Sequence, residues 1–136
     1  MFSIGQLSKR TGVKIPTIRY YEQMGLIDAP ERSEGNQRRY TKDGLGRLSF
    51  IRHSRDLGFS VEDIRGLLDL SQRPEKPCRD VDSIAAKHLK DVQARIAKLR
   101  RLERELKRIT QCDAAHVAEC AVIETLADHG LCETEH

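Results

Sequence analysis

The chain has 136 residues, a formal net charge of +3, no tryptophan and an aromatic content of only 4%. Because 33% of the residues are charged and so few are aromatic, an elongated helical protein that buries surface against a partner chain is favoured over a large globular core. No apolar run approaches the roughly 20 residues that span a bilayer, and the N-terminus lacks the layout of a signal peptide. We therefore expect a cytoplasmic protein with no membrane partner, whose cysteines are thiols or metal ligands rather than disulfides.

Charge is distributed unevenly along the chain. Residues 1–58 carry eleven Lys or Arg against six Asp or Glu, whereas residues 110–136 carry six Asp or Glu and no Lys or Arg. A basic head suits a polyanion and an acidic tail suits a cation, so the two ends are expected to have different partners.

The first 25 residues predict two short helices. Ser3 followed by Gln6 is typical of a capping box that opens a helix, which Gly12 ends. Pro16 suits the first position of a second helix, which stops at Gly25. This is the layout of a helix-turn-helix, although short helix pairs are common in all-α proteins.

A small hairpin is predicted next, with Glu34-Gly35-Asn36 at its tip and Tyr40 closing it. Its composition is that of a wing whose arginines grip phosphates beside a recognition helix. The arginines that form this set are Arg19, Arg32, Arg38 and Arg39. Any single one of them could be a merely solvated surface residue, but as a set on two adjacent elements they favour contact with DNA.

Two further helices complete the predicted head. Thr41 caps a third helix that Gly58 ends, and Ser60 with Asp63 opens a fourth. No nucleophile–base pairing and no Gly-rich phosphate loop is visible, so an enzyme is not predicted.

A long helix follows, because residues 81–110 contain neither Gly nor Pro. Its apolar stripe has steps of three and four residues, close to the heptad rhythm of a coiled coil. The stripe consists of Ala85, Leu89, Val92, Ile96, Leu99, Leu102, Leu106 and Ile109. A helix of about 45 Å is too long to pack on a 70-residue head alone, so a homodimer is favoured over a lone surface helix. The predicted parts are a DNA-binding domain (1–70), a linker carrying Cys78 (71–80), a dimerisation helix (81–111) and a metal-binding loop, short helix and flexible tail (112–136).

The head closely resembles the DNA-binding head of the MerR family. The resemblance rests on Ile4-Gly5-Gln6-Leu7-Ser8-Lys9, Thr17-Ile18-Arg19-Tyr20-Tyr21-Glu22, Gly25-Leu26-Ile27, Arg32-Ser33 and Arg38-Arg39-Tyr40. It implies a mainly all-α winged helix-turn-helix fold whose second helix enters the major groove, while the wing and a later helix hold phosphates. The DNA contacts that it implies are Arg19, Arg32, Arg38 and Arg55, with Tyr20 packing beside them. Gln37 stands where many members carry an aromatic residue.

The same resemblance implies that the two long helices of a dimer run antiparallel. Cys78 of one chain would then meet Cys112 and Cys120 of the other, and three thiolates suit soft divalent ions. His116 is either a fourth ligand or an exposed loop residue. The tail residues Cys132 and His136 are either a second site or an unused terminus.

The resemblance also separates metal classes. Members that sense monovalent copper lack a cysteine at the position of Cys78, whereas members that respond to divalent metals carry it. Gln111 stands where a zinc sensor has the first of two adjacent cysteines, so cadmium or lead is favoured, with zinc and mercury remaining. The implied function is a homodimeric activator that binds a palindromic promoter and distorts it for RNA polymerase when metal binds, turning on heavy-metal resistance genes. The alternatives are a copper or silver sensor with Cys78 idle, and a metal buffer that does not bind DNA.

Overall fold

The first two helices begin and end where local side chains favour it. The structure is a computed structural model that describes residues 1–28, 31–32, 35, 38–111 and 116–131. Helix α1 (Ile4–Thr11) opens with the predicted capping box, in which the Ser3 hydroxyl accepts from the Gln6 N–H at 3.1 Å and the Gln6 side chain accepts from the Ser3 N–H at 2.8 Å. Helix α2 (Ile15–Gln23) has Pro16 in its first turn. Gly12 and Gly25 follow these helices at φ of +74° and +75°.

The wing and the next two helices complete the head. Strand β1 (Glu31–Arg32) pairs antiparallel with β2 (Arg38–Arg39). Thr41 caps α3 (Lys42–Asp56) by accepting from the Gly44 N–H at 3.1 Å, and Ser60 caps α4 (Val61–Ser71) by accepting from the Asp63 N–H at 3.1 Å. Both caps agree with the sequence-based expectation.

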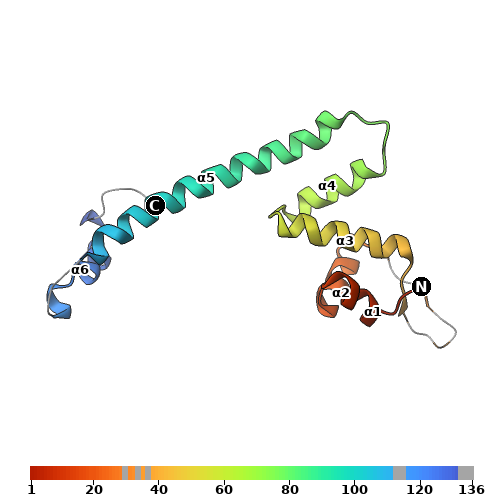
Figure 1. Cartoon of the computed structure of the whole chain (residues 1–136), viewed down its shortest axis with the longest axis horizontal. Coiled ribbons are helices and arrows are strands. Elements are labelled where there is room, and N and C mark those ends of the chain that lie inside the picture. The colour runs from red at the N-terminus through yellow and green to blue at the C-terminus, as the bar shows by residue number, and fades with distance from the viewer. Residues whose placement is uncertain (29–30, 33–34, 36–37, 112–115, 132–136) are drawn as a thin grey trace. The chain divides into compact units, whose positions relative to one another are not determined.

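One core holds the head together. Helix α3 lies between α4 on one side and the pair α1 and α2 on the other (Figure 1). The largest fully buried side chains of this core come from four helices and the turn after α2. They are Leu7, Ile18, Leu26, Leu48, Ile51 and Ile64. On α3 the buried Leu48 and Ile51 lie three residues apart, so this helix turns one apolar face inward.

Helix α5 (Cys78–Thr110) has 33 residues and begins three residues before the predicted start at Val81. Pro77 directly before it and Asp80 in its first turn both favour a helix N-terminus, so Cys78 is the first residue of the helix rather than part of a linker. The chain divides into two compact units, Met1–Ile84 and Ala85–His136. Helix α5 begins in the first unit and continues into the second.

The apolar stripe of α5 is largely uncovered in the single chain. Leu89, Ile96, Leu99 and Leu106 are between 42% and 64% exposed. Ile109, the last residue of the stripe, is only 4% exposed, because the chain itself covers this end of α5. Burial of apolar surface is favourable in water, so the exposed stripe suits a partner helix.

Short helices follow α5 in the second unit. They are η1 (Val117–Glu119), α6 (Ala121–Ala127) and η2 (His129–Leu131). Thr125 of α6 is 8% exposed, and Glu105 and Ile109 of α5 are similarly buried. In the parts of the chain that the structure describes, no helix has the length and apolar character needed to cross a membrane.

Candidate DNA-binding surface and metal ligands

Helix α2 presents the two residues predicted to face DNA. Ile18 is fully buried and Tyr21 is 8% exposed, so one face of the helix belongs to the core. Arg19 and Tyr20 lie on the remaining surface and are exposed, and Tyr20 is 48% exposed. The Tyr20 ring lies 6.0 Å from the Tyr21 ring, between centroids, at an interplanar angle of 54°. A cationic and an aromatic side chain are therefore available together on the second helix of the helix-turn-helix.

The base of the wing is anchored to the head. The backbone of Tyr40 exchanges two hydrogen bonds with Phe2, at 2.7 and 2.8 Å, and its hydroxyl donates to the carboxylate of Glu22 on α2. Arg32 is exposed on β1, while Arg39 is half-buried on β2. Tyr40 thus ties the wing both to the N-terminus and to α2.

Part of the wing is described only at its backbone or not at all. The backbone of Arg38 pairs with that of Arg32. Gln37 and the predicted tip residues Glu34 and Asn36 lie outside the described residues, whereas Gly35 is described as a turn residue.

Arg55, the remaining predicted DNA contact, lies near the end of α3. Its guanidinium donates to the backbone carbonyl of Phe59 at 2.8 Å, across the turn at Gly58. This bond holds an exposed cationic side chain at the corner between α3 and α4. Whether Arg55 also touches a phosphate stays a prediction, as it does for Arg19, Arg32, Arg38 and Arg39.

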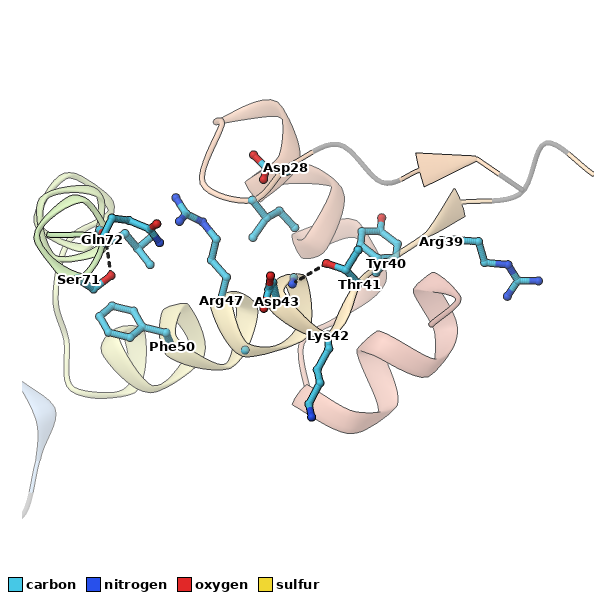
Figure 2. Close-up of a pocket in the computed structure, with 14 residues that line it drawn as sticks. Asp28, Arg39, Tyr40, Thr41, Lys42, Asp43, Arg47, Phe50, Ser71 and Gln72 are labelled. Atoms are coloured by element: carbon cyan, nitrogen blue, oxygen red, sulfur yellow. Dashed lines mark hydrogen bonds between the residues drawn. The ribbon is translucent and has the colours of Figure 1, made fainter. Parts of the chain in front are cut away.

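A pocket of about 850 Å³ lies between the end of the wing, α3 and α4 (Figure 2). Arg47, Lys42, Asp28 and Asp43 bring charges of both signs to its lining, and Phe50 adds an aromatic ring. The labelled Arg39 side chain points away from the other lining residues in this view (Figure 2). The balance of charges does not favour an anion over a cation in this pocket.

Three arginines of α3 and α4, which the sequence analysis did not assign to the site, hold the ends of α1 and α2. Arg52 donates to the carbonyl of Gly12 at 2.6 Å, Arg47 donates to that of Leu26 at 2.5 Å, and Arg65 donates to that of Met24 at 2.7 Å. Each accepting carbonyl lies where a helix has just ended, where carbonyls lack intrahelical donors. The glycines after α1 and α2 were visible signals of these helix ends, but no local pattern identifies the donors.

The predicted metal ligands lie on both units. Cys78 is exposed at the start of α5, and Cys120 is half-buried directly before α6. His116 is exposed directly before η1. Cys112, like the tail residues Cys132 and His136, lies outside the described residues.

The described part of the chain contains no cluster of three or more His, Cys, Asp or Glu side chains arranged to hold a metal. That the ligands come from two chains stays a prediction. The donor chemistry fits a soft ion, because two of the described candidates, Cys78 and Cys120, are free thiols.

Arg108 of α5 links this helix to the segment after Cys120. Arg108 donates to the Glu105 carboxylate at 2.9 Å and to the backbone carbonyl of Leu131 at 2.5 Å. The Glu105 side chain is 9% exposed, so its charge is compensated inside the second unit. This contact keeps η2 against the end of α5, beside the helix that Cys120 precedes.

Known proteins match the chain along nearly its whole length. The family described as "MerR HTH family regulatory protein" matches residues 2–71, and the family described as "MerR, DNA binding" matches residues 45–109. The transcriptional regulator ZntR of Escherichia coli K12 is 42% identical over 130 residues, which cover 93% of this chain and 92% of ZntR. The mercuric resistance operon regulatory protein of Bacillus cereus is 40% identical, and the alignment covers 92% of this chain and 96% of that protein.

A solved structure is similar to the same extent. It is that of the transcription regulator PbrR691 from Ralstonia metallidurans CH34 in complex with lead(II), with 40% identity and a TM-score of 0.80. The alignment covers 93% of this chain and 99% of PbrR691.

These matches confirm the predicted family, the mainly helical winged helix-turn-helix fold and the prediction of a transcription regulator rather than an enzyme. The helix-turn-helix, the wing and the long helix after them are the parts that the two family descriptions cover. The chain belongs to the MerR family of DNA-binding transcription regulators, and relatives of it are named for mercuric resistance and for dependence on heavy metals.

Proposed function

We propose that this chain is a homodimeric regulator that binds a palindromic promoter and changes transcription when a thiophilic divalent metal binds. The proposed site takes Cys78 from one chain and Cys112 and Cys120 from its partner. The observation that carries the proposal is the uncovered apolar stripe of α5, with Cys78 at the start of this helix and the other two cysteines after its end. An antiparallel partner on this stripe would bring the opposite ends together.

The relatives support a metal as effector. The Bacillus cereus relative is named for mercuric resistance, a relative from Rhizobium meliloti is named a heavy metal-dependent transcription regulator, and PbrR691 was solved with lead(II). Three thiolates match the preference of such ions, with His116 as a further candidate ligand. We place cadmium and lead first, and zinc and mercury after them, because Gln111 departs from a paired-cysteine zinc site.

The metal would act by shifting a conformational equilibrium. A ligand favours one state of a protein only by binding it more tightly than the other state. A site between two chains meets this condition, because its ligands approach only in some arrangements of the dimer. Such coupling of about 1–3 kcal/mol is comparable with the cost of deforming a promoter. RNA polymerase at the distorted promoter would then initiate transcription.

A mixed dimer tests whether the site is shared between chains. Cys78→Ser and Cys112→Ser homodimers should each lose tight binding of lead or cadmium, while a tagged heterodimer of the two should regain one site per dimer. In that heterodimer, one site has all its cysteines and the other lacks two. If each chain held its own site, the heterodimer would bind no better than either homodimer, and the proposal would fail.

Two further measurements complete the experiment. Cys132→Ser, a matched change in the tail, should keep metal binding, and every variant should keep wild-type affinity for promoter DNA. Retention of copper(I) binding and copper-dependent transcription by Cys78→Ser would instead identify a copper or silver sensor. Failure of the wild type to bind promoter DNA in a salt-dependent way would favour a metal buffer.

A further inference from the structure

The two helices of the helix-turn-helix end in the same way. Gly12 and Gly25 adopt φ of +74° and +75°, a region that glycine enters without strain. A guanidinium group covers each turn: a Cβ atom at Gly12 would lie 2.9 Å from Nη1 of Arg52, and one at Gly25 would lie 3.8 Å from Nη1 of Arg65. Each arginine donates to a carbonyl at the helix end, where the helix dipole favours a cation.

The arginines come from different elements. Arg52 and Arg47 belong to α3, whose Leu48 and Ile51 are fully buried in the core of the head. Arg65 belongs to α4 and reaches the carbonyl of Met24 at 2.7 Å. The end of α2 is therefore held twice, by α3 through Leu26 and by α4 through Met24.

Helix α4 also contacts the start of α5. Gly66, the residue after Arg65, faces Ile84, and a Cβ atom built on Gly66 would lie 3.5 Å from Cδ1 of Ile84. Ile84 is half-buried and lies six residues after Cys78 on the same helix. Two consecutive residues of α4 thus lie beside the end of α2 and beside Ile84 of α5.

We propose that Arg65 is a positioning residue that couples the Cys78 end of α5 to the helix that enters DNA. A shift of the first turns of α5 presses on α4 at Gly66, and Arg65 transmits the shift to the end of α2 because its bond is short and charge-assisted. Arg47 of α3 donates to the Leu26 carbonyl after α2, so it opposes this motion and sets the resting position of α2. The inference rests on the proposed metal response, and it assigns the route by which that response reaches the DNA-facing helix.

The test compares the metal-dependent change in promoter binding and transcription, rather than stability alone. Arg65→Ala removes the bond, and Arg65→Lys keeps the charge and a donor but not the planar fork of arginine. Arg73→Ala is the matched control, because Arg73 follows α4 and makes an exposed ion pair with Asp69 at 3.7 Å. Each full-length variant is titrated with lead(II) or cadmium(II) and assayed for DNA affinity and in vitro transcription with and without metal.

Arg65→Ala is expected to bind metal like the wild type, and its ratio of metal-induced to basal transcription should fall by about two- to thirtyfold. Arg65→Lys should recover part of the ratio, and Arg73→Ala should keep all of it. If Arg65→Ala does not fold, Arg65→Lys carries the comparison with its own smaller loss.

Two results would overturn the inference. One is a wild-type induction ratio in the Arg65 variants. The other is an equal loss of DNA affinity with and without metal, which a purely structural role predicts. A wild-type protein that does not respond to metal would refute the proposed function first, and the inference would fall with it, whereas a responsive wild type with equally responsive Arg65 variants refutes the inference alone.

Discussion

Leu99 lies in the uncovered apolar stripe of α5, and its replacement by alanine measures how much this stripe contributes to dimer formation. Leu99 is 64% exposed in the single chain. Complete burial of a leucine side chain contributes about 1.5–3 kcal/mol, so burial of the exposed part against a partner contributes about 1–2 kcal/mol per chain. A two-fold symmetric interface contains Leu99 twice, which gives about 2–4 kcal/mol, or an increase of about 30- to 700-fold in the dimer dissociation constant.

Analytical ultracentrifugation over a range of concentrations measures this constant directly. Leu57→Ala is the matched control, because Leu57 is 70% exposed at the end of α3, outside the stripe, and its truncation removes the same atoms. We expect the control to dimerise within about twofold of the wild type, since isolated exposed leucines contribute little. Equal dissociation constants for Leu99→Ala and Leu57→Ala would refute the assignment of the stripe to the dimer interface.

Three further predictions concern the head and its DNA. Ile51→Ala empties a fully buried position and is expected to lower the free energy of unfolding by about 2–5 kcal/mol in chemical denaturation; a change below about 1 kcal/mol would contradict the core described above. Gly12→Ala places a side chain at φ of +74° and 2.9 Å from Arg52, so a loss of about 1–2 kcal/mol is expected in the same assay, and an unchanged stability would count against it. Arg19→Ala is expected to reduce the slope of log affinity against log salt by about 1, because one phosphate contact is lost; Lys107→Ala, exposed on α5, should keep the slope, and equal slopes in both variants would exclude Arg19 from the phosphate contacts.

The beginnings and ends of the head helices followed from local signals. The sequence predicts Ser3, Thr41 and Ser60 as caps, and each accepts a hydrogen bond from an N–H three residues later. The sequence predicts that helices end at Gly12 and Gly25, and both glycines have positive φ. These signals are reliable because donor and acceptor lie within one turn of each other, so no distant packing is needed to bring them together.

The predicted start of α5 is three residues too late. The run without Gly or Pro from Val81 to Thr110 predicts a helix that begins at Val81, and the apolar stripe that supports it begins only at Ala85. The helix in fact includes Cys78, which follows Pro77 directly. Helix starts depend on the first turn, in which apolar periodicity is absent, so a pattern-based boundary misses them by a few residues. The consequence is functional, since Cys78 is the proposed ligand.

Some residues of the candidate site could be assigned from the sequence, and others could not. The sequence assigns Arg19 and Tyr20, through its resemblance to the MerR family, to the helix that faces DNA, and both side chains are exposed on α2. It could not indicate that Arg47, Arg52 and Arg65 hold the ends of α1 and α2, because their acceptors lie 21, 40 and 41 residues away.

The sequence by itself determined the helices, their caps, the heptad stripe and the family, because these depend on local hydrogen bonds, on periodicity and on motifs within a few residues. Only the tertiary structure decided which guanidinium meets which carbonyl, and that Gly66 lies against Ile84 beside Arg65. The physical reason is that a contact between distant residues exists only after the core formed by Leu48, Ile51 and Ile64 has set the helices in place. No local pattern of charge encodes that placement.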